Sequence, residues 1–280
     1  MRAALNITTY NNPRVLALCL ESLRNQSRLD FEIFISDDGS TEETRKLIDD
    51  FRARSGMVIH HHWHPDDGYK KSKINNVTFS KIDPVQFPVV ICIDHDVICH
   101  RDFVSDHLAI HEKQAKNGQN RVIFMGRRID LGPAVTAQLS VADIADFQSG
   151  VSWKLLKSWL SGDTRLIQRA VRVTSPLLIR LLGRDRVDDL LGSNFSISTQ
   201  LLLEVNGYNE DYVAYWGEDG DLFVRVRNSG AVLIGLKGYA IQYHLDHKRL
   251  EPSKENQARY QDLLKDRTYV RCRNGIKKGA

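Results

Sequence analysis

The chain contains 280 residues with a mass of 32.0 kDa and a formal net charge of +4. An apolar content of 42% argues against a mainly disordered chain; no apolar run approaches the roughly 20 residues that cross a bilayer, and the polar start MRAALNITTYNN is unlike a secretory signal. The four scattered cysteines, without a CxxC pair, argue against a disulfide framework or a cysteine zinc site and favour the reducing cytoplasm.

The first half of the chain alternates apolar runs with amphipathic stretches. Apolar, β-branched runs predict strands, and amphipathic stretches that begin with helix caps predict helices. In chain order, we expect strands at 3–8, 31–36, 57–63, 88–94 and 121–126, and helices that begin at Asn12-Pro13, at a capping box of Ser40 and Glu43, and at residues 70 and 102. This alternation is typical of βαβ units, so we expect an α/β fold with a largely parallel sheet.

The alternation stops between residues 132 and 191, where the chain is rich in Leu, Arg and Trp. Regular patterning returns with a run at 192–198, a helix near 200–206, a helix at 218–230 with an acidic first turn, and a last strand at 231–236. Positive charge is concentrated in two segments, because residues 151–186 hold eight Lys or Arg against two Asp and residues 265–280 hold six against one. The rest of the chain is therefore acidic.

Two carboxylates follow the most apolar of the predicted strands, in Asp94-His95-Asp96. Alternate residues of an extended segment share a face, so both carboxylates can reach one hard divalent cation, which can hold a diphosphate. The alternative is that acidic residues are simply common where strands reach solvent. Because ligands bind beyond the carboxyl ends of parallel strands, we expect Thr9-Tyr10-Asn11 and Asp37-Asp38 to lie along the same edge.

Four motifs occur in an order that resembles one family. They are TTYNNPRVLALCLESL, FISDDGSTEET, IDHDVICHRDFV and GSNFSISTQLLLEVNGYNEDYVAYWGEDGDLFVRV, and the resemblance covers about residues 3–130 and 190–260. The chain resembles inverting family-two glycosyltransferases with the GT-A fold, and the last motif resembles the carboxyl-terminal module of galactosyl- and N-acetylgalactosaminyltransferases. The resemblance implies a Rossmann-like, three-layer sandwich around a mostly parallel sheet, with a helical insertion.

The resemblance also implies an organisation along the chain. Residues 1–130 would form the nucleotide-sugar-binding half of the GT-A domain, and residues 192–250 the acceptor-binding and catalytic half. Residues 131–191 would be a basic helical insertion, and residues 251–280 a carboxyl-terminal helix with a basic tail.

A site for a UDP-sugar donor and a metal follows from the same resemblance. Thr9, Tyr10 and Asn11 would line the base and ribose, Asp38 would contact the uracil or ribose, Lys73 and Asn76 would face the diphosphate or ribose, and Asp94 and His95 would belong to the nucleotide-sugar site. Mn²⁺ or Mg²⁺ would be held by Asp94, Asp96 and His244, with Asp96 as the more direct ligand. A cation held there can stabilise the leaving diphosphate as a Lewis acid.

The resemblance assigns the acceptor side of the reaction to the last motif. Glu218 and Trp216 would bind the acceptor, and Asp219 would be the catalytic base that takes the proton of the acceptor hydroxyl. The first turn of a helix suits this role, because the helix dipole favours an ionised carboxylate. The alternative is that both carboxylates only cap the helix. Two departures from the family pattern, Asn206 in place of a Gly and a shorter Tyr-Trp-Gly stretch, concern the acceptor.

A second metal hypothesis comes from the histidine-rich stretch 60–67, HHHWHPDD. His62, His64 and Asp66 resemble the start of a metallo-hydrolase motif, although Asp67 stands where that motif has its final His. The alternative is that these residues are a strand edge beside the nucleotide pocket.

Two alternatives stay open for the basic segment 151–186. Its Trp153, Trp159 and leucines, with Lys154 and Lys157, form an amphipathic stretch that can lie in an anionic membrane interface. Alternatively, the same apolar side chains pack on the sheet as a helical subdomain and the basic residues are solvated. No RNA-binding motif accompanies the basic segments, so we expect no nucleic-acid partner.

Together these features predict an enzyme, a hexosyltransferase that moves a hexose or N-acetylhexosamine from a UDP-sugar to a carbohydrate acceptor with inversion. The acceptor would be an oligosaccharide or a lipid-linked saccharide, and the family implies a role in bacterial lipopolysaccharide or capsule synthesis. We expect a cytoplasmic protein, with peripheral attachment to the inner face of the cytoplasmic membrane left open. Two other functions are considered: a nucleotide-sugar-binding protein without transferase activity, against which an intact Asp219 argues, and a metallo-hydrolase using residues 60–67.

Overall fold

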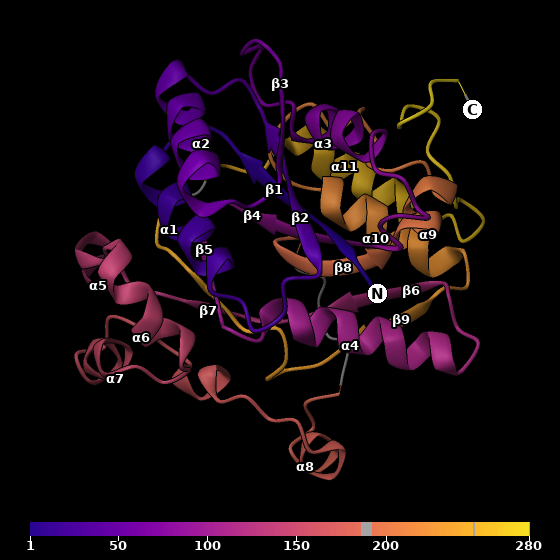
Figure 1. The fold of residues 1–280 in the computed structure, drawn as a ribbon. Coiled ribbons are helices and arrows are strands. Elements are labelled where there is room, and N and C mark those ends of the chain that lie inside the picture. Colours follow the sequence, from indigo (N-terminus) through magenta and orange to yellow (C-terminus); the bar gives the residue numbers. More distant parts are fainter. Residues whose placement is uncertain (186–191, 249, 280) are drawn as a thin grey trace.

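A seven-stranded sheet with the strand order β3-β2-β1-β4-β8-β6-β9 forms the centre of the molecule (Figure 1). The computed structural model describes residues 1–185, 192–248 and 250–279. The strands are β1 (Ala3–Thr9), β2 (Phe31–Asp37), β3 (Ile59–Trp63), β4 (Val89–Asp94), β6 (Val122–Met125), β8 (Asn194–Ser198) and β9 (Val232–Gly235). All neighbours are parallel except β8, which is antiparallel to β4 and β6. The predicted α/β fold with a largely parallel sheet is confirmed.

Helices cover both faces of this sheet, which gives three layers (Figure 1). One face packs against α1 (Pro13–Arg24), α2 (Glu42–Ser55) and α4 (Phe103–Lys116), and the other against α3 (Lys71–Phe79), α9 (Thr199–Glu204) and α10 (Glu218–Asn228). The alternation along β1 directs Leu5 into the first core and Ala4 into the second. The helix α11 (Lys254–Leu263) contacts α10.

A second, three-stranded sheet was not predicted from the sequence. Its order is β5-β10-β7, with β5 (Val97–Cys99), β10 (Gln242–His244) and β7 (Arg128–Asp130). The register pairs His244 with Val97 on one side and with Asp130 on the other. This small sheet therefore brings His244, which is distant in sequence, next to the residue that follows Asp96.

The region between β7 and β8 contains short helices, as its composition predicts. They are α5 (Pro133–Gln138), α6 (Ile144–Gln148), α7 (Trp153–Leu160) and α8 (Pro176–Leu181), with 3₁₀ turns at Val141–Asp143 and Ile167–Ala170. Apolar side chains of α5, α6 and α7 form a third core with Val15 and Leu18 of α1. Arg186 of the basic segment and residues 187–191 of the predicted insertion lie outside the described residues.

The predicted capping box at Ser40 and Glu43 is wrong. The helix α2 begins at Glu42 with Thr41 as its N-cap, and the Thr41 side chain makes no capping hydrogen bond. The Ser40 hydroxyl instead accepts a hydrogen bond from the Asn11 backbone N–H at 2.7 Å, and the Thr41 N–H donates to Asn11 Oδ1 at 3.0 Å. The first βα turn therefore ties the ends of β1 and β2 together in place of the box.

Among the described residues, no helix combines the length and the apolar character that crossing a membrane requires.

Candidate active site

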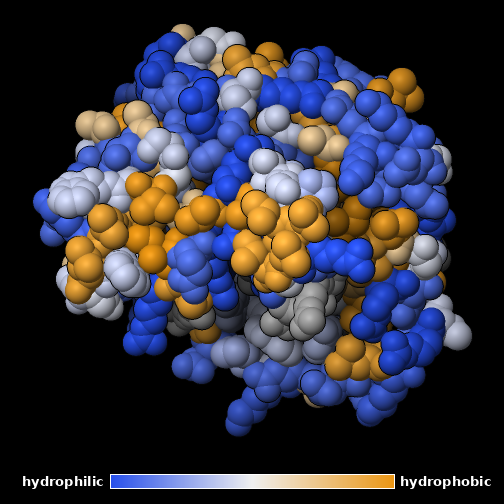
Figure 2. Space-filling view, turned by 90° about the horizontal axis from the view of Figure 1, so that it is seen from below, coloured by the Kyte–Doolittle hydropathy of each residue, from blue (hydrophilic) through white to orange (hydrophobic). Residues whose placement is uncertain are grey.

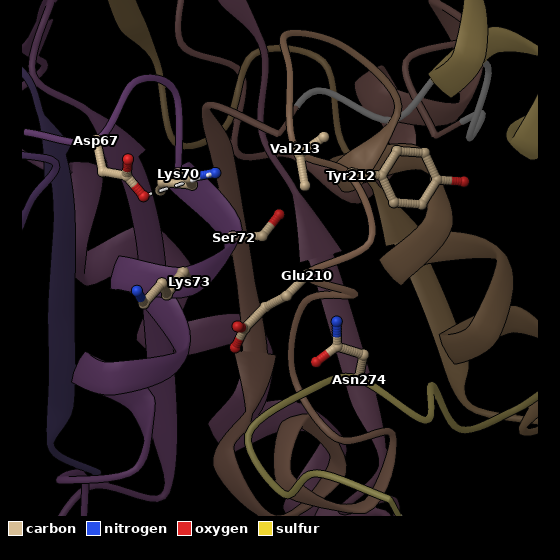
Figure 3. A pocket seen from close by; sticks show the side chains of 8 residues that line it. All are labelled: Asp67, Lys70, Ser72, Lys73, Glu210, Tyr212, Val213 and Asn274. Carbon is tan, nitrogen blue, oxygen red and sulfur yellow. Dashed lines mark ion pairs between the residues drawn. The ribbon is translucent and has the colours of Figure 1, made fainter.

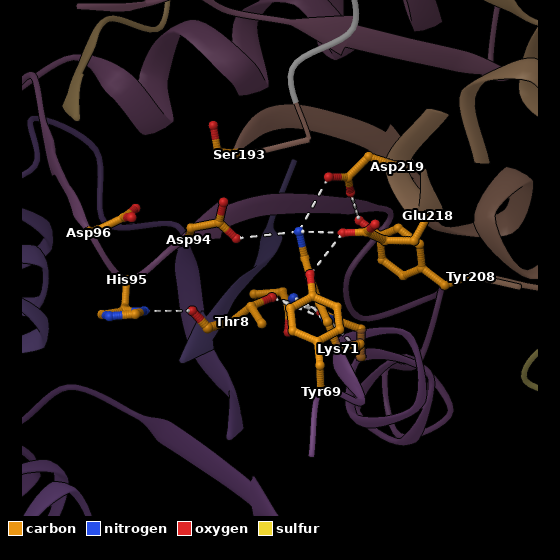
Figure 4. A network of polar contacts seen from close by, with 12 residues as sticks. Thr8, Tyr69, Lys71, Asp94, His95, Asp96, Ser193, Tyr208, Glu218 and Asp219 are labelled. Atoms are coloured by element: carbon orange, nitrogen blue, oxygen red, sulfur yellow. Dashed lines mark hydrogen bonds and ion pairs between the residues drawn. The ribbon is translucent and has the colours of Figure 1, made fainter. Parts of the chain in front are cut away.

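A buried ammonium group lies at the centre of a cluster of three carboxyl groups. Lys71 Nζ is 3.2 Å from Glu218 Oε1, 3.2 Å from Asp219 Oδ2 and 3.6 Å from Asp94 Oδ1 (Figure 4). These four residues line a cavity of about 590 Å³ together with Ser193, Tyr215, Trp216 and Tyr260, among others. Three elements therefore converge on one cavity, because Lys71 begins α3, Asp94 ends β4, and Glu218 and Asp219 open α10.

Burial and charge together set the protonation of this cluster. Burial opposes the charge of Lys71, but Asp219, Asp94 and Glu218 outweigh it and raise the pKa of Lys71 well above its ordinary value. Burial also raises the pKa of the Glu218 and Asp94 carboxyls, and Lys71 counteracts that rise in both. The cluster therefore keeps a positive charge among three carboxyl groups in a low-dielectric setting.

Two tyrosine hydroxyls orient the carboxylates of α10. Tyr69 donates to Glu218 Oε1 at 3.1 Å, and Tyr208 donates to Asp219 Oδ1 at 2.9 Å (Figure 4). The second oxygen of Glu218 is buried without a hydrogen-bond partner. A buried acceptor of this kind costs free energy unless a ligand pairs it, so Glu218 is prepared to bind a donor group in the cavity.

Glycines allow the backbone to approach these carboxylates. Gly217, the N-cap of α10, has φ +101°, and a Cβ there would lie 2.7 Å from the Tyr212 ring. A Cβ on Gly192 would lie 1.8 Å from Asp219 Oδ2, so only glycine fits beside that carboxylate. Trp216 precedes the helix with φ +85°, lines the cavity and packs edge-to-face on Tyr260 with 5.5 Å between ring centroids.

A candidate metal centre lies beside this cavity, at Asp96, His244 and His247. One ligand atom from each lies within 4.8 Å of the others; His247 Nε2 and His244 Nε2 are 3.0 Å and 3.4 Å from Asp96 Oδ2. Asp96 Oδ1 is buried without a partner, as expected of a carboxylate that awaits a ligand. The set of one carboxylate and two imidazoles fits a divalent transition metal.

The protonation of this centre in the absence of a metal follows from its contacts. Burial opposes the charge of Asp96, but hydrogen bonds from His244 and His247 hold the pKa of its carboxyl well below its usual range. Burial likewise opposes charge on His244, but Asp130 and Asp96 raise its pKa to about 9. A metal would displace those imidazole protons, because ligating histidine is neutral.

Asp94, the first acidic residue of the predicted metal motif, is not part of this cluster. Its side chain points toward Lys71 (Figure 4), whereas Asp96 pairs with His244 and His247. His247 was not predicted as a ligand. The spacing of His244 and His247, three residues apart, was the signal that could have found it. Between the two carboxylates, the His95 backbone N–H donates to Thr8 O at 3.0 Å.

The residues predicted to hold the nucleotide lie at the carboxyl ends of β1 and β2. Asp38 is buried; the Lys70 N–H donates to its Oδ2 at 2.9 Å, and its own N–H donates to Thr9 O. Tyr10 is exposed, and its hydroxyl donates to Asp66 at 2.9 Å. The Asn11 side-chain oxygen accepts a hydrogen bond from the Thr41 backbone N–H, beside the start of α2.

The two residues predicted to face the diphosphate do not line the cavity of Lys71 and Asp94. Lys73 lines a separate cavity of about 250 Å³, with Glu210 and Asn274 on its far side (Figure 3). Asn76 is buried and donates to Tyr208 O and to Glu210 Oε1. Lys71, and not Lys73, lies in the cavity with Asp94 and Asp219. Lys71 was not predicted as a site residue. It lies four residues before Asn75 and so on the same face of α3, and the Asn75 side chain donates a hydrogen bond to Thr8 on β1.

The histidines of residues 60–64 do not form the predicted alternative metal site. His60 pairs with Glu32 at 2.6 Å, His61 with Asp37 at 2.8 Å, and His64 with Asp38 at 3.1 Å. In the part of the chain that the structure describes, only the cluster around Asp96 brings three such ligand atoms together. Of the residues in the metallo-hydrolase hypothesis, His64 pairs with Asp38 and Asp66 accepts a hydrogen bond from Tyr10, so these two do not share a ligand position.

Two family models match the chain. The model described as "Glycosyl transferase family 2" matches residues 5–143, and the one described as "N-terminal domain of galactosyltransferase" matches residues 181–248. Chondroitin synthase of Escherichia coli is 23% identical over 266 residues, which are 90% of this chain and 35% of that protein. Validoxylamine A glucosyltransferase of Streptomyces hygroscopicus is 30% identical over 107 residues, or 38% of this chain and 24% of that protein.

Solved structures share the fold at low sequence identity. S. aureus TarS in complex with UDP is 14% identical with a TM-score of 0.62, over 94% of this chain and 64% of the other. The mannosyltransferase PcManGT from Pyrobaculum calidifontis, in complex with GDP-Man and Mn²⁺, is 12% identical with a TM-score of 0.54, over 96% of this chain and 69% of the other. The chain spans about a third of chondroitin synthase and about a quarter of the glucosyltransferase.

Proposed function

Because the chain belongs to glycosyl transferase family 2 and has the GT-A fold, we propose that it transfers a hexose or N-acetylhexosamine from a UDP-sugar to a carbohydrate hydroxyl, with inversion at the anomeric carbon. One observation carries this proposal. The Glu218–Asp219 pair and Lys71 face Asp94 across a single cavity, with the Asp96 metal centre beside it. Such a cavity combines a proton acceptor with positive charge for a leaving diphosphate.

The donor would lie along the carboxyl edge of β1, β2 and β4. Asp38 offers a buried carboxylate to a base or ribose, beside Thr9 and the exposed ring of Tyr10. Two solved relatives carry UDP and UDP-GlcNAc in their complexes, both of TarS, which supports a uridine nucleotide for this chain. PcManGT instead carries GDP-Man.

For the transfer step, we assign the role of base to Asp219. Its carboxylate would take the proton of the acceptor hydroxyl while the acceptor oxygen forms a bond to the anomeric carbon. The bond from that carbon to the diphosphate oxygen breaks at the opposite face, and UDP leaves with the electron pair. Lys71 stays protonated at neutral pH and would offset the charge that develops on the diphosphate. Tyr208 fixes the carboxylate by its hydrogen bond at 2.9 Å.

The metal would be held by Asp96, His244 and His247. This donor set suits a transition metal such as Mn²⁺ better than Mg²⁺, which takes oxygen ligands in proteins. A bound divalent cation supplies Lewis-acid stabilisation of a leaving diphosphate. The Mn²⁺ in the PcManGT complex supports a divalent cation for this chain.

The acceptor would enter at the rim formed by α10 and the stretch before it. The unpaired oxygen of Glu218 can accept a hydrogen bond from a sugar hydroxyl, and Trp216 offers an aromatic wall in the same cavity. We propose an oligosaccharide or a lipid-linked saccharide as the acceptor, and bacterial surface polysaccharide as the product class. The site of action would be the cytoplasm, at the inner face of the membrane.

Release of UDP tests the proposal directly. The chain is incubated with a panel of UDP-sugars and Mn²⁺, with and without saccharide acceptors, and UDP is measured. We expect one UDP-sugar to yield UDP at a rate that an acceptor increases and chelation abolishes, and NMR of the product to give the inverted anomer. Binding of UDP without release from any donor and acceptor pair would identify a nucleotide-sugar-binding protein instead.

A further inference from the structure

The helix α7 divides its side chains between protein and solvent. Leu155 is buried in the third core, whereas Trp153 is 64% exposed, Trp159 45% and Leu160 69%. Of these four side chains, Leu155 alone packs in the core, as the helical-subdomain alternative predicts for all of them. The two tryptophans present their rings to solvent instead.

The helix α8 repeats this division. Ile179 is buried, whereas Leu177 is 67% exposed and Leu181 71%, and Leu178 and Leu182 are exposed beside them. Four exposed leucines within six residues are unusual on a protein surface, where large apolar patches mark binding sites. Figure 2, which views the molecule from below, shows hydrophobic residues gathered over the parts of this face where Figure 1 draws α7 and α8.

Charge at the same helices is positive toward solvent. Arg165 and Arg180 are exposed, and Lys157 Nζ lies 5.5 Å over the ring of Trp153. Of the acidic neighbours, Asp163 accepts hydrogen bonds from the Ala134 and Val135 backbone and Asp143 pairs with Lys154, whereas Asp185 is exposed after α8. The apolar side chains are therefore accompanied by cations whose charge is available to an anionic partner.

We propose that this surface binds an anionic lipid bilayer at its interface. We call it the lipid-facing surface; it consists of Trp153, Lys157, Trp159, Leu160, Arg165, Leu177, Arg180 and Leu181. Tryptophan suits the boundary between headgroups and acyl chains, leucine can enter that boundary, and Lys and Arg attract anionic headgroups. Helices of eight and six residues can only lie on a membrane, not cross it. Binding to lipid needs neither donor nor acceptor sugar, so it is independent of the proposed transfer reaction.

The charge complementarity favours lipid over a second copy of the chain. A surface whose exposed charge is positive would repel its own copy in a symmetric contact, whereas anionic headgroups neutralise it. A membrane also accommodates scattered tryptophan and leucine side chains without a shaped partner surface. The bilayer is therefore the occupant that we test.

Co-sedimentation of the full chain with lipid vesicles, in the absence of any UDP-sugar, tests this inference. We expect the chain to bind vesicles that contain phosphatidylglycerol, to bind pure phosphatidylcholine weakly, and to be released as salt rises. Leu177→Ser/Leu181→Ser should lower binding by roughly tenfold or more, because buried methylene groups drive insertion. Val85→Ser is the matched control, because Val85 is 88% exposed in the loop before β4 and should leave binding unchanged.

A second pair of variants separates charge from apolar contact. Arg165→Ala/Arg180→Ala should weaken binding to anionic vesicles at low salt by roughly 25-fold, about fivefold for each charge near the surface. Lys46→Ala/Lys265→Ala is the control, because it removes two exposed charges in α2 and just after α11. It should weaken vesicle binding less. Circular dichroism identifies any variant that unfolds. If the leucine variant unfolds, vesicle binding by Arg165→Ala/Arg180→Ala tests the inference.

Three outcomes would overturn the inference. The first is equal binding to neutral and anionic vesicles, and the second is vesicle binding that neither pair of variants changes. The third is a chain that binds no vesicles and is a dimer by light scattering, with the leucine variants monomeric. UDP release with a soluble acceptor should be unchanged in the leucine variants, so failure of the transferase proposal and failure of this inference remain distinguishable.

Discussion

Lys71 Nζ and Asp219 Oδ2 are 3.2 Å apart, so a buried cation holds the carboxylate that we propose as the catalytic base. The same ammonium is equally close to Glu218. Lys71 thus links Asp94, on the donor side of the cavity, to Glu218 and Asp219 on the acceptor side. The predictions below use this link to separate the roles of the residues.

Removal of the base should damage chemistry and spare binding. Asp219→Asn keeps the size and the helix position of the side chain but loses its proton acceptor. We expect kcat to fall by roughly 100-fold or more, while UDP-sugar affinity stays near wild type. Asp262→Asn, on an exposed helix end, is the control and should leave both unchanged. Transfer by Asp219→Asn within a few-fold of wild type, at saturating acceptor, would remove this residue from the mechanism.

Lys71→Met should weaken UDP binding and lower stability. The substitution leaves three carboxyl groups in a buried cluster without their cation, so the free energy of unfolding should fall by about 3–5 kcal/mol. Lys73→Met is the matched control two residues along, because Lys73 lines the other cavity. Chemical denaturation and UDP titration measure the two effects. A larger loss of UDP affinity in Lys73→Met would restore the assignment predicted from the sequence.

The double variant Lys71→Met/Asp219→Asn tests whether the cation and the base interact energetically. Removal of the charge of Asp219 relieves part of the strain left by Lys71→Met, so the double variant should be more stable than the sum of the single variants predicts. A double-mutant cycle on unfolding free energy gives the coupling, which we expect to be about 1–3 kcal/mol for residues in contact. Simple additivity would show that the two side chains do not interact as described.

Loss of any one ligand of the metal centre should weaken Mn²⁺ binding. Asp96→Ala, His244→Ala and His247→Ala should each weaken Mn²⁺ binding by roughly tenfold or more in calorimetric titration, because each removes one donor of the set. Asp94→Asn should weaken it less, because its side chain is directed to Lys71. Unchanged Mn²⁺ affinity in His247→Ala would restrict the centre to the residues predicted from the sequence.

Stability should fall in mild acid because of two buried histidines under the sheet. His107 and His111 both contact the Ser196 hydroxyl, and burial lowers their pKa values to about 3 and about 4. In the unfolded chain they take up protons near pH 6.5, so the unfolded state binds more protons between about pH 6.5 and pH 3. The melting temperature should therefore fall as the pH drops through this window. His111→Gln should flatten the profile; an unaltered profile would show that other groups cause the loss.

The parallel half of the fold could be predicted because its strands and helices are long enough to show their periods. The strands at 3–8, 31–36 and 88–94 and the helix opened by Asn12-Pro13 lie within one or two residues of the predicted bounds. The strands β5, β7 and β10 have three residues each, and no alternation can be read from so short a run. Their pairing partners are distant in sequence, so the small sheet had no local signal.

Parts of the candidate site were predictable for a similar reason. Asp94, Asp96, Glu218 and Asp219 follow or open regular elements, and the residue pattern places them at one sheet edge. The choice between Lys71 and Lys73 depends on the rotation of α3, a helix whose polar residues surround it on several sides. His247 lies beyond the end of β10, where only the folded small sheet brings it toward Asp96.

The helix α1 is shared between two cores. Leu16, Leu20 and Leu23 pack under the main sheet, whereas Val15 and Leu18 belong to the core of α5, α6 and α7. Excision of residues 133–181 would therefore uncover an apolar stripe on the helix that directly follows Asn11. The inserted helices therefore cannot be removed without exposing α1, and the chain should unfold as one cooperative unit. A relative can exchange this segment only if it changes the outer apolar stripe of α1 as well.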